Sequence, residues 1–242
     1  MKRPLSISFL SLAIGLAIAP SAWPSAEDKK NEADEGRRMD AAATVLNEVM
    51  GTPDKGIPEE ILESAKCVAV VPSMLKGGFV VGANYGKGVA TCRTRTGWSA
   101  PAPFKIVGGS VGFQIGGEAA DVVMIVVNDK GMKELLSSKF KLGADASVAA
   151  GPVGRHAEGD TDWKMRAEVL SYSRARGVFA GVALDGAAIT QDEDETRVLY
   201  GEKVSFEHIL TGDVPPPSGS GTFLATVKKY TAEARAAKAE TR

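Results

Sequence analysis

The pattern most suggestive of catalysis is Gly108-Gly109-Ser110-Val111-Gly112, which matches the Gly-x-Ser-x-Gly motif of hydrolase nucleophile elbows. Such an elbow needs a strand, a sharp turn and then a helix, which together present the serine hydroxyl. The residues after Ser110 instead continue in a strand-like pattern, and only His156 and His208 are available as a base. We therefore predict a glycine-bent strand and no catalytic residue. A hydrolase built on Ser110 is the weakest of our alternatives.

Sequence motifs for nucleotides and metal ions are missing. Neither Gly-x-Gly-x-x-Gly nor Gly-x-x-x-x-Gly-Lys-Ser/Thr occurs. The two histidines and two distant cysteines lack metal-ligand spacing, and Asp192-Glu193-Asp194-Glu195 lacks the central glycine of a calcium loop. We interpret this acidic run as the solvated start of a helix. The sequence predicts neither a metal site nor a cofactor.

Basic side chains are more suggestive, because they gather in and beside the glycine-rich middle of the chain. If several converge on one face, they could hold an anionic head group while an apolar patch takes acyl chains. The alternative is a set of scattered, solubilising charges. The residues are Lys76, Lys87, Arg93, Arg95, Lys139, Lys141, Arg155, Arg174 and Arg176.

Residues 1–26 have the order of a cleavable secretory signal peptide: Lys2 and Arg3, an uncharged apolar run from 5 to 19, and then small residues. The apolar run is shorter than the roughly 20 residues of a spanning helix, and prolines follow it directly. We expect cleavage between residues 21 and 27. The expected location is periplasmic or secreted, at the periphery of a membrane if lipid is bound.

Removing Lys2 and Arg3 changes the balance of 29 basic and 30 acidic side chains to 27 against 30, a net charge of −3. This charge argues against binding of nucleic acid. Export would also permit a disulfide. Cys67 and Cys92 both lie in strand-like runs, so a cross-strand bridge and two buried free thiols are both compatible with the sequence.

The elements that would position these groups fall into three stretches. From 32 to 50, apolar residues recur at helical spacing, which predicts an amphipathic helix that either packs on the core or inserts at a membrane surface. A second short helix is predicted from Pro58 to Lys66, because proline suits a first helical turn. From 67 to 185, short β-rich runs are broken by glycine, at 67–71, 78–85, 89–95, 105–115, 121–127, 140–150 and 176–184.

Glycine within strands is typical of bulges, bends and close backbone approach, so we predict a curled sheet. The fold class is α+β: a single domain with a curled, glycine-rich, mainly antiparallel β-sheet or small barrel flanked by helices. Further helices are predicted at 131–138, 163–172, 192–199 and 205–210. The predicted domain spans 32–212. A Pro/Gly linker and a helical tail, docked or mobile, occupy 213–242.

Several runs together resemble the SYLF-domain family, also called the lipid-binding or actin-binding SYLF proteins. Among them are Lys76-Gly77-Gly78-Phe79-Val80-Val81-Gly82 and Gly97-Trp98-Ser99-Ala100-Pro101. The resemblance covers the chain from Met39 to Leu210, and the ordered series is more specific than any single glycine pattern. The other runs are 65–72, 85–88, 112–116, 141–155 and 170–181.

The resemblance implies a non-enzymatic module. Eukaryotic members bind phosphoinositide membranes through a basic, amphipathic N-terminal helix, and yeast members bind and bundle actin. By position, Arg37 and Arg38 and the helical face of Met39, Ala42, Leu46 and Val49 would then face a membrane. An exported protein is not expected to meet cytoskeletal actin.

We therefore predict an exported, non-enzymatic module that binds anionic phospholipid or phosphoinositide-like head groups at a membrane surface. The alternative is a structural or protein-interaction module of the cell envelope, with an envelope protein as its partner. The candidate lipid-binding residues are Arg37, Arg38, Met39, Leu46, Lys76, Lys87, Lys141, Arg155, Arg174 and Arg176.

Overall fold

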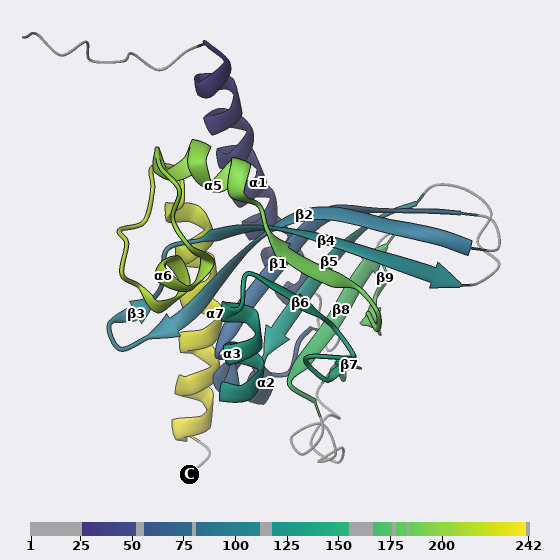
Figure 1. Cartoon of the computed structure of the whole chain (residues 1–242). Coiled ribbons are helices and arrows are strands. Elements are labelled where there is room, and N and C mark those ends of the chain that lie inside the picture. The colour runs from purple at the N-terminus through teal and green to yellow at the C-terminus, as the bar shows by residue number, and fades with distance from the viewer. Residues whose placement is uncertain are drawn as a thin grey trace, which may run out of the picture.

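Figure 1 shows the computed structural model of the chain, which describes residues 26–51, 56–78, 81–111, 118–154, 167–175, 178–182 and 184–240. Residues 1–25 of the predicted signal peptide lie outside these ranges, and so do the candidate residues Arg155 and Arg176. The described residues form one domain in which helices pack on a single curled sheet. The predicted α+β fold class is confirmed.

The sheet contains ten strands in the order β6-β10-β4-β2-β1-β5-β8-β7, with β3 paired to β2 and β9 paired to β8. All these pairs are antiparallel except β7 with β8. The longest strands form its centre. The strands are β1 (Cys67–Gly78), β2 (Val81–Thr94), β3 (Gly97–Trp98), β4 (Ala102–Val111), β5 (Glu118–Val126), β6 (Lys139–Lys141), β7 (Val148–Ala150), β8 (Val169–Ala175), β9 (Val178–Gly181) and β10 (Ala188–Gln191).

Glycine allows neighbouring parts of the curled sheet to approach closely. A Cβ atom at Gly88 would lie 2.4 Å from the carbonyl oxygen of Val70 and 2.7 Å from the ring of Phe104. A Cβ atom at Gly86 would lie 2.4 Å from a methyl group of Val71. Because a side chain at either position would collide with these neighbours, only glycine fits there.

Helix ends follow local capping chemistry. The side chains of Asn128, Asp192 and Ser205 each accept a hydrogen bond from a backbone N–H in the first turn of the helix that follows. Gly201 and Gly212 end two of the helices in the left-handed conformation. The helices are α1 (Ala26–Met50), α2 (Glu59–Ser64), α3 (Asp129–Leu136), α5 (Glu193–Tyr200), α6 (Phe206–Thr211) and α7 (Gly221–Glu240).

Apolar residues alternate between the two faces of the sheet and form a core on each. On the face that we call inner, Val71 and Phe104 pack with Phe206 of α6. On the face that we call outer, Val70 belongs to the cluster that contains the buried residues of α1, α2 and α7. Since both faces are covered here, the run from 67 to 71 is apolar at every position.

Cys67 and Cys92 form a disulfide with a sulfur–sulfur distance of 2.03 Å. The two residues are direct partners in the β1–β2 register. The bridge therefore links the two central strands covalently on the inner face of the sheet, where both residues are fully buried. The sequence was compatible with a disulfide or with two buried free thiols, and the structure contains the disulfide.

The prediction of a helix at 163–172 is wrong over its described part, because residues from Val169 onward form β8. Val169 to Tyr172 are all buried, since the strand lies between the two cores. An apolar run of that length fits a doubly covered strand as well as a helix. From residue 81 onward, the strand runs predicted at 78–85 and 89–95 form one strand, β2, whereas Gly78 ends β1 and residues 79 and 80 lie outside the described ranges. The run predicted at 140–150 is two short strands.

The C-terminal helix is part of the domain body. Phe223 and Val227 of α7 are buried in the outer core beside α1 and α2. The Tyr230 hydroxyl also donates to the side-chain oxygen of Asn47 in α1 at 2.9 Å. The sequence allowed a C-terminal tail that is either docked on the domain or mobile, and in the structure it is docked.

Candidate functional site

The basic side chains that share a face lie on the outer side of the sheet. Lys87 of β2 and Lys105 of β4 are direct partners in the strand register. Lys87 lies two residues from Val89, which belongs to the outer core, so it points to that face. Arg174 of β8 lies two residues from Tyr172, another member of that core, and is the register partner of Asp121 in β5.

These four residues, Lys105, Lys87, Asp121 and Arg174, form a line across the sheet that we call the charged row. Between Lys87 and Asp121 the line crosses β1 at its bulge, where the backbone N–H of Ser73 donates to Asp121 Oδ1 at 3.0 Å. Arg174 donates to Asp121 Oδ2 at 2.8 Å and also pairs with Glu48 of α1. Each cation of the row is thus held by carboxylates, while its side chain stays partly exposed, at 31% for Lys87, 32% for Lys105 and 27% for Arg174.

The two lysines extend into a larger cluster of charges between α1, the sheet and α5. Lys105 Nζ lies 2.9 Å from Asp192 Oδ1, and Lys87 Nζ lies 3.4 Å from Asp192 Oδ2. Lys87 also donates to Glu195 Oε1. We call this group the α1–α5 cluster, and its members are Glu35, Arg38, Lys87, Lys105, Asp192 and Glu195.

Glu35 is the buried acid of this cluster. It is fully inaccessible to solvent, and burial raises its pKa to about 8, helped by the neighbouring Glu195 carboxylate and opposed by the Arg38 guanidinium. Burial also acts to raise the pKa of Glu195, but its contacts with Glu35, Lys87 and Arg38 outweigh this and lower it. With Glu35 neutral, the cluster holds three cations and two carboxylates, so it carries a net positive charge at neutral pH.

The other candidate residues are spread over the domain. Met39 and Leu46 are buried in the outer core, so the apolar face of α1 packs on the sheet, which was one of our two alternatives for it. Arg37 is exposed and pairs with Asp34. Lys76 follows Leu75 in β1 and therefore points to the inner side, and Lys141 lies exposed on β6, at one edge of the sheet.

The predicted residues therefore do not form one site. Lys87 and Arg174 share a face, and Arg38 joins Lys87 through Glu195. Lys105 was missed, although its spacing within β4 could have indicated it once the register was known. The acidic run 192–195 was correctly predicted to start a helix. The prediction that the run is solvated is wrong for Asp192, which is almost completely buried against the two lysines.

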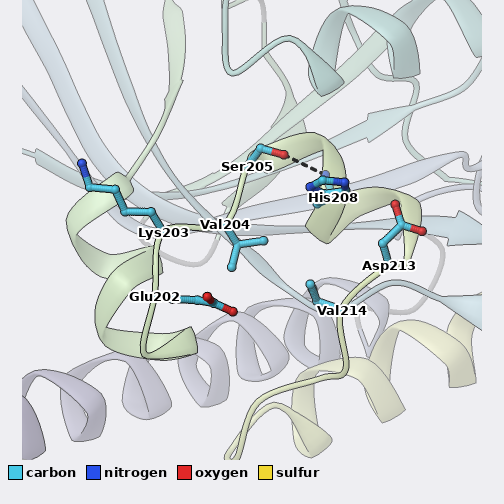
Figure 2. Close-up of a pocket in the computed structure, with 7 residues that line it drawn as sticks. All are labelled: Glu202, Lys203, Val204, Ser205, His208, Asp213 and Val214. Atoms are coloured by element: carbon cyan, nitrogen blue, oxygen red, sulfur yellow. Dashed lines mark hydrogen bonds between the residues drawn. The ribbon is translucent and has the colours of Figure 1, made fainter.

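No described feature supports the hydrolase alternative. Ser110 lies within β4, where it is the register partner of Gly82. Figure 2 shows a surface pocket of about 320 Å³ near α6 that is lined by another serine, histidine and aspartate. There the Ser205 hydroxyl accepts the backbone N–H of His208 as a helix cap, and the Asp213 carboxylate accepts the Thr211 hydroxyl. These are contacts of helix termini, not of a catalytic triad.

Two other kinds of site are also not found among the described residues. No group of three or more histidine, cysteine, aspartate or glutamate side chains in these ranges is arranged to hold a metal ion. In the same part of the chain, every helix is too short or too polar to span a bilayer. The candidate site among the described residues is thus the charged outer face of the sheet.

Comparison with known proteins gives consistent similarities. The Ysc84 family model, described as "Las17-binding protein actin regulator", matches residues 107–230. SH3 domain-containing YSC84-like protein 1 of Rattus norvegicus and of Homo sapiens are each 33% identical over 210 residues, which cover 86% of this chain and 61% of the relative. LAS seventeen-binding protein 3 of Saccharomyces cerevisiae is 33% identical over 198 residues, 80% of this chain and 43% of that protein. The chain thus spans less than two thirds of the length of the curated relatives it matches.

Proposed function

The chain belongs to the Ysc84 family, the group of SYLF proteins that its motifs resemble, and from this premise we propose that it is a non-enzymatic module that binds anionic lipid at a membrane surface. The names of the relatives describe binding and regulatory proteins. Non-enzymatic binding also agrees with the arrangement of the described residues, in which the candidate serines lie in a strand or cap a helix.

The observation that carries this proposal is the pair Lys87 and Lys105. They lie side by side on the outer face of the sheet, and each side chain keeps about a third of its surface in solvent. The α1–α5 cluster behind them has a net positive charge while Glu35 is protonated. A phosphate group can approach the exposed part of both lysines while they keep their contacts with the buried Asp192 carboxylate.

The test is vesicle flotation of the protein produced from its full coding chain, with anionic and neutral vesicles at low and high salt. Binding to anionic vesicles that weakens with salt is expected, because paired surface charges are screened. The double variant Lys87→Gln and Lys105→Gln should lose most of this binding. Lys141→Gln, which removes an exposed lysine at the edge of the sheet, is the matched control. Equal recovery with anionic and neutral vesicles would refute the proposal.

A second candidate function is binding of a protein partner. It is favoured by the description of the family as Las17-binding and by the name of the yeast relative. For this chain the partner would be a protein of the cell envelope. Cross-linking in intact cells that recovers one specific protein, together with failure to float with any vesicle, would favour this function over lipid binding.

We also propose that the protein is exported. The order of residues 1–26 supports this, and the Cys67–Cys92 bridge is typical of proteins that fold in an oxidising compartment. Mass spectrometry of the protein purified from its own host should find an N-terminus between residues 22 and 27. A mature chain that retains Lys2 and Arg3 would contradict export by cleavage.

A further inference from the structure

Binding at a membrane surface usually needs apolar contact as well as charge. In this domain α1 cannot supply that contact, because Met39 and Leu46 are buried against the sheet. Among the described residues, the large apolar side chains that are most exposed lie elsewhere. They are Leu75 at 60%, Tyr85 at 43%, Val107 at 51%, Val153 at 39% and Val178 at 69%.

Three of these side chains are neighbours across adjacent strands. Tyr85 of β2 pairs in register with Leu75 of β1 on one side and with Val107 of β4 on the other. Leu75 in turn pairs with Ala119 of β5, which is also exposed. We call these four residues the apolar row. Because register partners point to the same side of a sheet, the row is a continuous apolar surface across four strands.

The apolar row lies directly beside the charged row. Tyr85 is two residues from Lys87 in β2, and Val107 is two residues from Lys105 in β4. Residues two apart on a strand share a face and lie about 7 Å apart. The two lysines therefore border the apolar row on the same outer face.

The row lies on a part of the sheet that none of the described helices covers (Figure 1). We call this part the sheet extension, and it comprises residues 74–78, 81–86, 106–111 and 118–120 of β1, β2, β4 and β5. In Figure 1 these strands project sideways past α1 and α7. Within the described residues, the exposed side chains of Leu75, Tyr85 and Val107 leave this face open to a large, flat partner.

We propose that the apolar row is the surface that enters the interface of an anionic bilayer, with Lys87 and Lys105 seated against the head groups. This inference rests on the proposed function and locates its site. The charge next to the row favours a lipid surface, since apolar side chains bordered by lysines match acyl chains bordered by phosphates. Tyr85 suits such a position, because its ring is apolar and its hydroxyl can stay at the head-group level.

The first test replaces apolar groups of the row without changing charge. The double variant Leu75→Thr and Val107→Thr places a β-branched residue at both strand positions, so the sheet should still form. Its affinity for anionic vesicles should fall about tenfold or more, given the apolar area that would no longer leave water. The control is Val178→Thr, which removes a still more exposed valine. Val178 is next to Phe179, a residue that packs on the outer core, so Val178 points to the other face.

The outcomes separate the site from the function. If the parent protein floats with anionic vesicles and the double variant floats equally well, the apolar row is not the contact surface, although the lipid-binding function stands. If the parent protein floats with no vesicle, the proposed function itself fails, and this inference fails with it. An equal loss for Val178→Thr would also overturn the assignment of the row.

A second test reports the depth of insertion. Tyr85→Trp places an indole in the row, and its fluorescence should be quenched by vesicles that contain brominated acyl chains. Val178→Trp should show no more quenching than the parent protein. Equal quenching of the two variants would show that the row has no preferred contact with the bilayer.

Discussion

The body of the sheet and the sheet extension are built from the same strands but have different surroundings. In the body, outward-pointing residues such as Val70 and Val89 lie beneath α1 and are fully buried. In the extension, outward-pointing residues of the same strands, such as Leu75 and Tyr85, are exposed. The charged row separates the two parts. The difference shows that apolar alternation specifies the faces of a strand, whereas the reach of the covering helix decides which outward residues belong to the core.

The strongest way to test this difference is to truncate one residue in each region. Met39→Ala removes a fully buried side chain of α1 from the body and should lower the free energy of unfolding by about 2–5 kcal/mol. Leu75→Ala in the extension should change it by no more than about 0.5 kcal/mol. Urea unfolding followed by circular dichroism measures both. Similar losses for the two variants would mean that the extension is also part of the packed core.

The disulfide sharpens the comparison, because it ties β1 to β2 only in the body. Its cysteines are 25 residues apart, and removing the bridge with Cys67→Ala and Cys92→Ala should cost about 3 kcal/mol of stability. The folded variant should still bind anionic vesicles with the affinity of the parent protein, since the extension lacks this bridge. A large loss of vesicle affinity in a fully folded double-cysteine variant would mean that the structure of the extension depends on the bridge in the body.

The buried acid of α1 gives the body a pH dependence. Because the pKa of Glu35 rises from 4.5 in the unfolded chain to about 8 in the folded one, the folded state holds this proton more tightly between these values. The free energy of unfolding should therefore fall as the pH rises through this window, by at most about 1.4 kcal/mol per pH unit. Thermal unfolding across this pH range measures the slope.

The matched variants for this pH experiment lie on the same helix. Glu35→Gln, which keeps the side chain neutral, should remove this contribution to the slope. Asp40→Asn, which changes an exposed carboxylate of α1, should leave it unchanged. A slope that survives Glu35→Gln in full would assign the pH dependence to other groups.

The smallest expected effect concerns the boundary between the regions. Glu195→Gln removes one carboxylate from Lys87, so the lysines bordering the extension should attract anionic vesicles about fivefold more strongly, as expected for about one added charge near a membrane. Glu193→Gln, at an exposed position of the same helix, should have a weaker effect. Vesicle flotation at low salt measures both. A decrease for Glu195→Gln would mean that this carboxylate positions Lys87 for lipid instead of competing with it.

Local chemistry predicted much of the fold. Proline and acidic residues identified the start of α2, and the acidic run with Asp192 identified the start of α5. The β-rich runs with glycine identified the curled sheet. The failure at β8 has a physical reason, because a strand buried on both faces lacks the alternation that separates strands from helices.

The candidate site was harder to predict, because its residues come together only in the fold. Lys87 and Lys105 become neighbours through the β2–β4 register, and Asp192 reaches them from another part of the chain. The amphipathic pattern of α1 located its apolar face but could not show what covers it. The burial of Met39 depends on the sheet beneath the helix, and the exposure of Leu75 depends on where that helix ends its contact.

The pairing of α1 with α7 has a consequence for the order of assembly. The hydrogen bond from Tyr230 to Asn47 joins residues 183 positions apart, and Phe223 fills the same core as the first helix. As the chain emerges from its N-terminus, the part of the outer core that α1 shares with α7 therefore stays uncovered until nearly the whole polypeptide is available. Contacts of such long sequence separation slow folding and prolong the exposure of apolar surface. We expect the nascent protein to depend on chaperones until its last helix has been made.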